Sequence, residues 1–176
     1  MAFPPRLRRM LGMRVRTAVV LVGLVALALG AAMDGMRRRE LRRLLADPLV
    51  EAAKAGDVAE VRRLLDRGAD VDSIVNGRFP WTPLMHAAFE GREGVARLLL
   101  DRGADPDRED LDSFRAITLA AGEGHWGIVR LLIERGADAA AGDGHGKTPL
   151  DYAREARAAE MVRMLEGAGT PSRRRR

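Results

Sequence analysis

A repeat with a period near 33 limits the possible folds of this chain more than any other feature of its sequence. Four glycines mark the repeat, at positions 68, 103, 136 and 169, so successive copies follow at nearly equal intervals. The first three of these glycines continue with the same tripeptide, Gly-Ala-Asp. Such a period is typical of arrays in which each copy is one small unit that buries its apolar face only against its neighbours.

Pairs of apolar residues keep the same register in every copy. Each marker glycine follows a pair of large apolar residues: Leu64-Leu65, Leu98-Leu99, Leu131-Leu132 and Met164-Leu165. Further upstream stand three pairs of alanines: Ala52-Ala53, Ala87-Ala88 and Ala120-Ala121. The alanines predict two helices that approach closely, and the leucines predict burial between helices. The first three marker glycines are expected to end the second helix of their copies with a positive φ.

The tripeptide Thr-Pro-Leu predicts where two of the helices begin. Thr82 and Thr148 are expected to cap these helices with their hydroxyl groups, and the following proline fits the first helical position. Asp151 would lie in the first turn, where a carboxylate favours the positive end of the helix. Asp47-Pro48 predicts a similar start for the first copy.

These motifs resemble the ankyrin repeat over residues 47–170, as four copies at about 47–72, 73–107, 108–140 and 141–170. The resemblance implies an all-α fold, a solenoid of helix-turn-helix units with short hairpin fingers between them. The chain departs from the family pattern in several places. Met85 and Asp151 stand where the family usually has histidine, and His86 is one position late.

The third copy replaces Thr-Pro-Leu with Arg115-Ala116-Ile117. Arg115 lacks the hydroxyl group of the threonine in the second and fourth copies, and Ala116 replaces their proline. Asp112 or Ser113 is therefore expected to cap this helix instead.

The family binds other proteins through its fingers and the concave face of its first helices. The resemblance places the fingers at about 70–81, 105–114 and 138–147, and the first is two residues longer than the repeat requires. Residues 74–79 in this longer finger predict a small hairpin, because Asn-Gly favours a tight turn. Lys54, Phe89, Gly122 and Arg154 are expected at equivalent positions on the concave face.

Aromatic and arginine side chains are frequent anchors of protein interfaces. The candidate partner-binding residues are therefore Arg78, Phe79, Trp81, Phe89, Phe114 and Trp126. Phe79 and Trp81 are expected near the surface. The alternative for each aromatic residue is that it packs over the adjoining copy and belongs to the core.

The sequence predicts a protein that is not an enzyme, with no catalytic, cofactor-binding or metal-binding residues and no small-molecule substrate. Cysteine is absent, and His86, His125 and His145 fall at different offsets of their copies. His125 occupies a position where the family often has histidine. A catalytic centre needs several such groups held together in one pocket.

An uncharged apolar segment, residues 17–33, follows five arginines near the N-terminus. This order predicts either a signal peptide, cut after Ala32, or a single transmembrane helix of minimal length. A third interpretation is a buried or cytoplasmic helix. Residues 34–46 would form a basic linker helix. We expect a protein of the cell envelope, anchored in the membrane or periplasmic or secreted after cleavage, with a cytoplasmic location as the alternative.

The positive charge of the chain lies at its two ends. Residues 1–46 contain ten arginines against two acidic residues, and residues 173–176 are all arginine, whereas residues 47–172 have a net charge of −7. Residues 171–176 are expected to form a disordered basic tail. Because a nucleic-acid site should make the folded part basic, nucleic acid is the weakest candidate partner. The favoured function is a protein-binding adaptor or inhibitor, and the second is a structural membrane tether.

Overall fold

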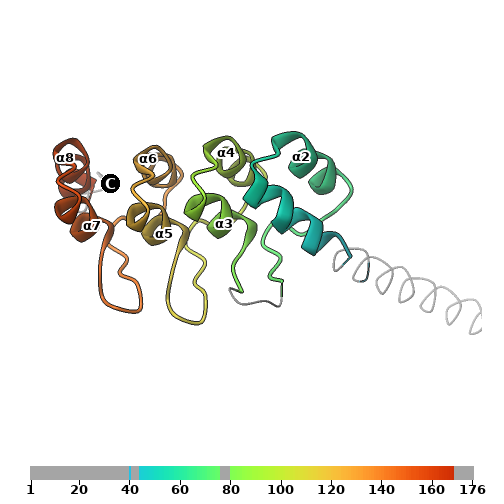
Figure 1. Cartoon of the computed structure of the whole chain (residues 1–176), viewed down its shortest axis with the longest axis horizontal. Helices are drawn as coiled ribbons and strands as arrows, with labels where there is room; N and C mark the ends of the chain where they lie inside the picture. Colours follow the sequence, from blue (N-terminus) through green and yellow to red (C-terminus); the bar gives the residue numbers. More distant parts are fainter. Residues whose placement is uncertain (1–39, 41–43, 76–79, 169–176) are drawn as a thin grey trace, which may run out of the picture. The chain divides into compact units, whose positions relative to one another are not determined.

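The structure, a computed structural model, describes residues 40, 44–75 and 80–168, and these residues form helices and loops without a strand. The contacts divide the chain between Leu41 and Arg42, and the repeats lie in the unit that begins at Arg42. Four helix pairs follow one another in this unit, and a finger joins each pair to the next (Figure 1).

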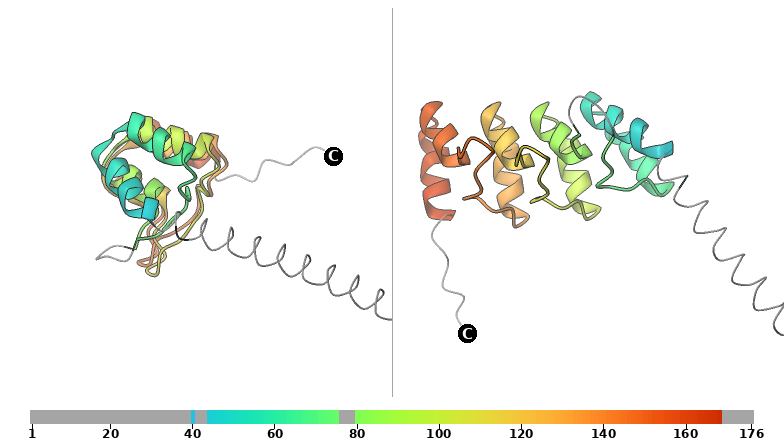
Figure 2. Two further views of the ribbon diagram at one scale, coloured as in Figure 1. Left: turned by 90° about the vertical axis from the view of Figure 1, so that its right-hand side faces the viewer. Right: turned by 90° about the horizontal axis from the view of Figure 1, so that it is seen from below.

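Each repeat contributes a first and a second helix. The first helices are residues 44–55, α3 (Pro83–Phe89), α5 (Ala116–Gly122) and α7 (Pro149–Glu155). The second helices are α2 (Val58–Asp66), α4 (Glu93–Asp101), α6 (Trp126–Glu134) and α8 (Ala159–Ala168). Helices α3, α5 and α7 contact one another in one row, and α2, α4 and α6 do so in a second row. The fingers all project from the same side of the array (Figure 2).

The predicted helix starts are confirmed in the second and fourth repeats. The Thr82 hydroxyl accepts a hydrogen bond from the Met85 N–H at 3.2 Å. The Thr148 hydroxyl accepts one from the Asp151 N–H, and the Asp151 carboxylate accepts one from the Thr148 N–H at 2.9 Å. These reciprocal bonds satisfy N–H groups that have no partner within a helix.

Two predicted helix starts are wrong. The first helix is already formed at residue 44, so Asp47 and Pro48 lie inside it. Leu45 and Leu49, four residues apart on one helix face, are both buried, and this burial extends the helix beyond the proline. A proline in a helix removes one backbone hydrogen bond.

In the third repeat, neither Asp112 nor Ser113 caps α5. The Thr118 hydroxyl accepts a hydrogen bond from the Arg115 N–H at 3.0 Å and donates one to the Arg115 carbonyl. A threonine inside the first turn therefore substitutes for the missing cap.

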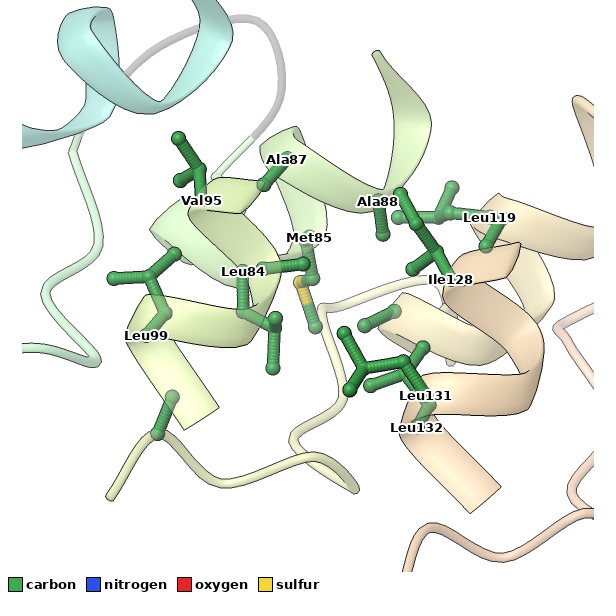
Figure 3. Close-up of a cluster of buried hydrophobic side chains, with 14 of the residues drawn as sticks. Leu84, Met85, Ala87, Ala88, Val95, Leu99, Leu119, Ile128, Leu131 and Leu132 are labelled. Atoms are coloured by element: carbon green, nitrogen blue, oxygen red, sulfur yellow. The ribbon is translucent and has the colours of Figure 1, made fainter. Parts of the chain in front are cut away.

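The core is a continuous layer between the helices of all four repeats. The three predicted alanine pairs are buried, and Leu64, Leu98, Leu99, Leu131, Leu132 and Leu165 are buried with them. Figure 3 shows how the apolar side chains of α3 and α4 meet those of α5 and α6. The core also includes Leu45 and Ala46, so the array begins before the expected boundary at residue 47.

The predicted glycine conformation at the ends of the second helices is confirmed. Gly68, Gly103 and Gly136 have φ values of +93°, +86° and +91°. Two salt bridges cross neighbouring repeats beside them, because Arg102 pairs with Asp66 at 2.8 Å and Arg135 pairs with Asp101 at 2.7 Å. These exposed pairs are worth little individually, and they repeat the same geometry from one copy to the next.

Several predictions concern residues outside the described ranges. They are the apolar segment 17–33, most of the linker 34–46, the Asn-Gly turn of the first finger, and the basic tail 171–176. Among the helices that the structure describes, none has the length and hydropathy needed to cross a membrane.

Candidate functional site

Three aromatic rings of the second repeat lie close together on the side of the array formed by α3, α5, α7 and the fingers. The Trp81 ring lies 5.3 Å from the His86 ring and 5.3 Å from the Phe89 ring, centroid to centroid. Trp81 comes from the end of the first finger, whereas His86 and Phe89 lie three residues apart on α3 and therefore share one helix face. Phe89 is partly buried and packs against the core.

The expectation that Trp81 stands near the surface is wrong. The residue is only 7% exposed, and its indole N–H donates a hydrogen bond to Asp110 Oδ2 at 2.7 Å. A buried indole N–H needs such an acceptor, and the next repeat supplies it. Trp81 is therefore a buried residue that packs against Phe89, and its hydrogen bond to Asp110 connects the second repeat to the second finger.

Asp110 organises the tip of the second finger. Its Oδ1 atom accepts hydrogen bonds from the Asp112 N–H at 2.9 Å and from the Phe114 N–H at 2.8 Å. The Asp110 N–H donates to the Phe114 carbonyl at 3.0 Å. The Asp110 carboxylate therefore joins the residues of the fingertip through their N–H groups and also accepts the indole N–H of Trp81.

Asp143 plays the same part in the third finger, one repeat further along the chain. Its Oδ1 atom accepts hydrogen bonds from the N–H groups of His145 and Lys147, and its Oδ2 atom accepts one from the Tyr152 hydroxyl at 2.6 Å. Burial raises the pKa of Asp143, but the hydrogen bonds from Tyr152 and the two N–H groups outweigh it, and the net shift is downward. Burial and the Asp143 carboxylate raise the pKa of Tyr152 to about 12.

Aspartates also tie each finger to the next. The Asp72 carboxylate accepts a hydrogen bond from the Asp105 N–H at 3.2 Å, and the Asp107 carboxylate accepts one from the Asp138 N–H at 2.8 Å. Burial raises the pKa of Asp72, and the bond from Asp105 partly opposes that effect. The third finger has Ala140 at the equivalent position, so this series of aspartates ends there.

Side chains of the residues directly before α4 and α6 contact the ends of the first helices of the preceding repeats. His125 Nε2 lies 3.0 Å from the Phe89 carbonyl oxygen of the preceding repeat. Arg92 occupies the same repeat position in the second repeat, and its Nε–H donates to the Lys54 carbonyl at 2.9 Å. His125 therefore makes a structural contact that connects the third repeat to the second at Phe89, the last residue of α3.

His86 is a buried imidazole next to a positive charge. It is 7% exposed, and Lys54 and Glu51 on the preceding first helix both act on it electrostatically. Burial, with a smaller contribution from Lys54, lowers the pKa of His86 to about 4. The side chain is therefore neutral at pH 7 and packs against Trp81 as an uncharged ring.

The structure brings some of the candidate partner-binding residues together and leaves others apart. Trp81 and Phe89 form one cluster, and Phe114 lies in the second finger, with its ring 6.1 Å from that of His145. Trp126, half-buried, is the first residue of α6. Arg78 and Phe79 lie outside the described residues.

The assignment of Arg154 to the concave row is wrong. Helix α3 ends at Phe89, α5 at Gly122 and α7 at Glu155, so Glu155 is the equivalent residue of the fourth repeat. A shift of one residue turns a side chain by about 100° around a helix. Arg154 pairs with Glu166 of α8 at 2.9 Å, whereas Glu155 pairs with Lys147 of the third finger at 2.9 Å.

Sequence reasoning missed the residues that shape the fingertips. Leu111 is 90% exposed at the tip of the second finger, and Asp110 and Asp143 hold the two tips. The available signal was that these two aspartates are separated by one repeat period. This spacing is difficult to recognise, because Asp110 stands in a run of acidic residues and nothing in the sequence distinguishes it from the others.

The described part of the chain provides ordered loops and a cluster of three aromatic rings. Among the described residues, no three His, Cys, Asp or Glu side chains are grouped so that they could hold a metal ion. The carboxylates of Asp105, Asp107 and Asp110 accept hydrogen bonds from backbone N–H groups instead.

Two family models match the sequence. One describes ankyrin repeats in many copies and matches residues 99–153, and the other describes ankyrin repeats in three copies and matches residues 27–110. Together they extend over residues 27–153, which include all of the first three repeats. No curated protein matches the sequence.

Proposed function

Because the chain belongs to the ankyrin-repeat family, we propose that its repeats form a non-catalytic module, an adaptor or inhibitor, that binds another protein at the cell envelope. Ankyrin repeats are generally protein–protein interaction modules. The binding surface would consist of the fingers and the exposed parts of α3, α5 and α7.

The observation that carries this proposal is that the fingers are held in place before any partner arrives. Asp110 and Asp143 close two fingertips, and Asp72 and Asp107 join neighbouring fingers through backbone N–H groups. A loop that is already ordered loses little conformational entropy on binding.

Phe89 is the favoured anchor on the helical part of this surface. It is the only aromatic residue among Lys54, Phe89, Gly122 and Glu155, the four equivalent positions in the repeats. The buried Trp81 ring supports it from one side. Phe89 is partly exposed, and aromatic side chains are enriched in protein interfaces.

The test is a binding measurement on the double variant Phe79→Ala with Phe89→Ala. A partner is first recovered by pull-down with the full chain, and its affinity is then measured by calorimetry. We expect the double variant to bind at least about tenfold more weakly, roughly 1.4 kcal/mol. Arg62→Ala on the exposed face of α2 is the matched control and should leave the affinity unchanged.

Thermal unfolding of the same variants separates binding from folding. If the double variant folds normally and binds as tightly as the original chain, these two residues are not in the interface. If it loses affinity together with its folded state, Phe89 is a core residue. Failure to recover any partner by pull-down or by cross-linking in cells would contradict the proposed function itself.

The envelope location is proposed from the apolar segment 17–33 and the arginines before it. Cell fractionation combined with mass measurement of the mature N-terminus tests this point. A chain that begins after Ala32 indicates a cleaved signal, and a full-length chain in the membrane fraction indicates an anchor. A full-length chain in the cytosolic fraction would contradict the proposed location.

A further inference from the structure

The tip of the second finger presents a leucine to solvent. Leu111 is 90% exposed, more than any other large apolar residue in the part of the chain that the structure describes. Burial of a leucine side chain is favourable, and Leu111 makes no such contribution within the described part of the chain. A single exposed leucine is common on protein surfaces, so the surroundings of Leu111 decide whether it matters.

The tip is held rigidly on both sides of Leu111. Asp110 accepts two backbone hydrogen bonds from the residues after it, as described above. Ser113 has φ at +60°, which is an unusual and strained conformation for a residue other than glycine. The hydrogen bonds therefore stabilise a strained loop that keeps Leu111 away from the core.

The third finger lies beside this tip and lines one side of a hollow. An open hollow is lined by Leu111, Asp112, Ser113, Phe114, Gly144 and His145. A side-chain carbon added at Gly144 would overlap the carbonyl oxygen of Asp112, so glycine is what allows the two tips to touch. The Phe114 and His145 rings meet edge to face at 6.1 Å and add an aromatic side to the hollow.

The charge around Leu111 is strongly negative. Residues 105–114 contain five acidic residues and one basic residue, Arg108. Glu109 pairs with Arg115, and Asp110 is occupied within the fold. The Asp112 carboxylate, directly beside Leu111, is exposed and forms no hydrogen bond or ion pair with the described residues.

From this arrangement we infer that the tip of the second finger, with the adjoining side of the third, binds a protein segment that carries a large apolar side chain flanked by lysine or arginine. The apolar side chain would cover Leu111 and enter the hollow, and the cations would face Asp112 and its acidic neighbours. An anionic lipid surface, which would also take an exposed leucine, is disfavoured because it repels these carboxylates. The inference rests on the proposed function, and it adds the chemistry of the partner.

Selection from a random library of 12-residue peptides displayed on phage tests this chemistry while the native partner is still unidentified. The target is the full chain in a mild detergent. We expect the enriched peptides to combine lysine or arginine with a large apolar residue. Leu111→Ser should weaken their binding at least tenfold, and Asp112→Asn should weaken it about threefold and reduce its dependence on salt.

Ile74→Ser is the matched control, because Ile74 is a 42% exposed apolar residue of the first finger. It should change the binding of the selected peptides by less than twofold. Enriched peptides without cations, equal effects of Leu111→Ser and Ile74→Ser, or no enrichment at all would each overturn the inference. If a native partner is recovered and Leu111→Ser does not affect its binding or that of the peptides, the inference fails while the proposed function stands.

Discussion

Arg157 adopts a backbone conformation that the three preceding repeats assign to glycine. Gly56, Gly91 and Gly124 have φ values of +82°, +70° and +75°, and Arg157, at the equivalent place after α7, has φ at +54°. A residue with a Cβ atom loses about 1 kcal/mol or more in this conformation. The last repeat therefore carries a local strain that the others avoid.

We expect Arg157→Gly to stabilise the array by about 0.5–1 kcal/mol, because relief of the strain exceeds the added entropy of the unfolded chain. Urea titration measures the change. Gly124→Ala is the reciprocal control and should destabilise by about 1 kcal/mol, since the added carbon meets nothing closer than the Trp126 ring nitrogen at 3.9 Å and only φ matters there. Destabilisation by both variants would show that the Arg157 side chain has a role that outweighs its conformation.

His86 makes the stability of the array depend on pH. Its folded pKa of about 4 lies below the unfolded value of about 6.5, so the unfolded state binds the proton first as the pH falls. The contribution of neutral His86 is fully present above about pH 6.5 and is lost progressively down to about pH 4. Most carboxylates remain ionised down to pH 5, so the upper part of this range reports on His86.

We expect the free energy of unfolding to fall between pH 7 and pH 5 by at most about 2 kcal/mol from this group. In His86→Gln the fall should be much smaller. Urea titrations of both proteins at the two pH values give the comparison. An equal fall in both would assign the pH dependence to groups other than His86.

At the scale of single elements, the fingers depend on aspartates in a way that helices do not. A helix supplies its own backbone partners, whereas a finger of about ten residues must find acceptors for its N–H groups elsewhere. Asp110 and Asp143 provide these acceptors, and each also anchors a side chain, Trp81 or Tyr152. The tips therefore have a fixed conformation although they contain no regular secondary structure.

Substitution of Asp110 should separate its two roles. Asp110→Asn keeps an acceptor for the tip but turns an amide donor towards the Trp81 N–H, and we expect a loss of about 1–2 kcal/mol. Asp110→Ala removes all three bonds and should cost about 2–4 kcal/mol. Unfolding monitored by Trp81 fluorescence in a Trp126→Phe background gives both values. Equal losses for the two variants would mean that the tip bonds contribute nothing beyond the bond to Trp81.

At the scale of the whole array, stability comes from contacts between neighbours, so position along the array matters. Helix α4 contacts both α2 and α6, and Leu98 on α4 is 6% exposed. At the C-terminal end of the array, α8 follows α7 and carries the buried Leu165. In a linear array a central defect weakens two interfaces and a terminal defect weakens one.

We therefore expect Leu98→Ala to destabilise the array by about 2–5 kcal/mol and to separate the unfolding of its two halves. Leu165→Ala should be milder and should leave a single transition shifted to lower urea concentration. Circular dichroism, and Trp81 fluorescence in the same Trp126→Phe background, follow both variants during urea titration. A loss for Leu98→Ala no larger than about 0.5 kcal/mol, the size typical of a surface substitution, would contradict the assigned packing.

The sequence by itself determined the repeat architecture, because each copy must bury the same apolar face and therefore repeats the same residue types at the same spacing. The helix caps at Thr82 and Thr148 and the positive φ of the marker glycines follow from interactions between residues close together in the chain, and the buried alanine pairs follow from their regular spacing in the repeat. Local interactions of this kind are encoded by the residues that make them. The family and its general role in binding proteins follow from the same pattern.

Only the tertiary structure decided which aromatic and acidic side chains are buried, because that depends on partners in other repeats. Trp81 is buried through an acceptor 29 residues away, and Leu111 is exposed because a bond within its own tip holds the loop outwards. The start of the first helix before Pro48 also depends on packing against the core, since burial of Leu45 and Leu49 offsets the lost hydrogen bond. Contacts across repeats join residues that are distant in sequence, and no local pattern reveals them.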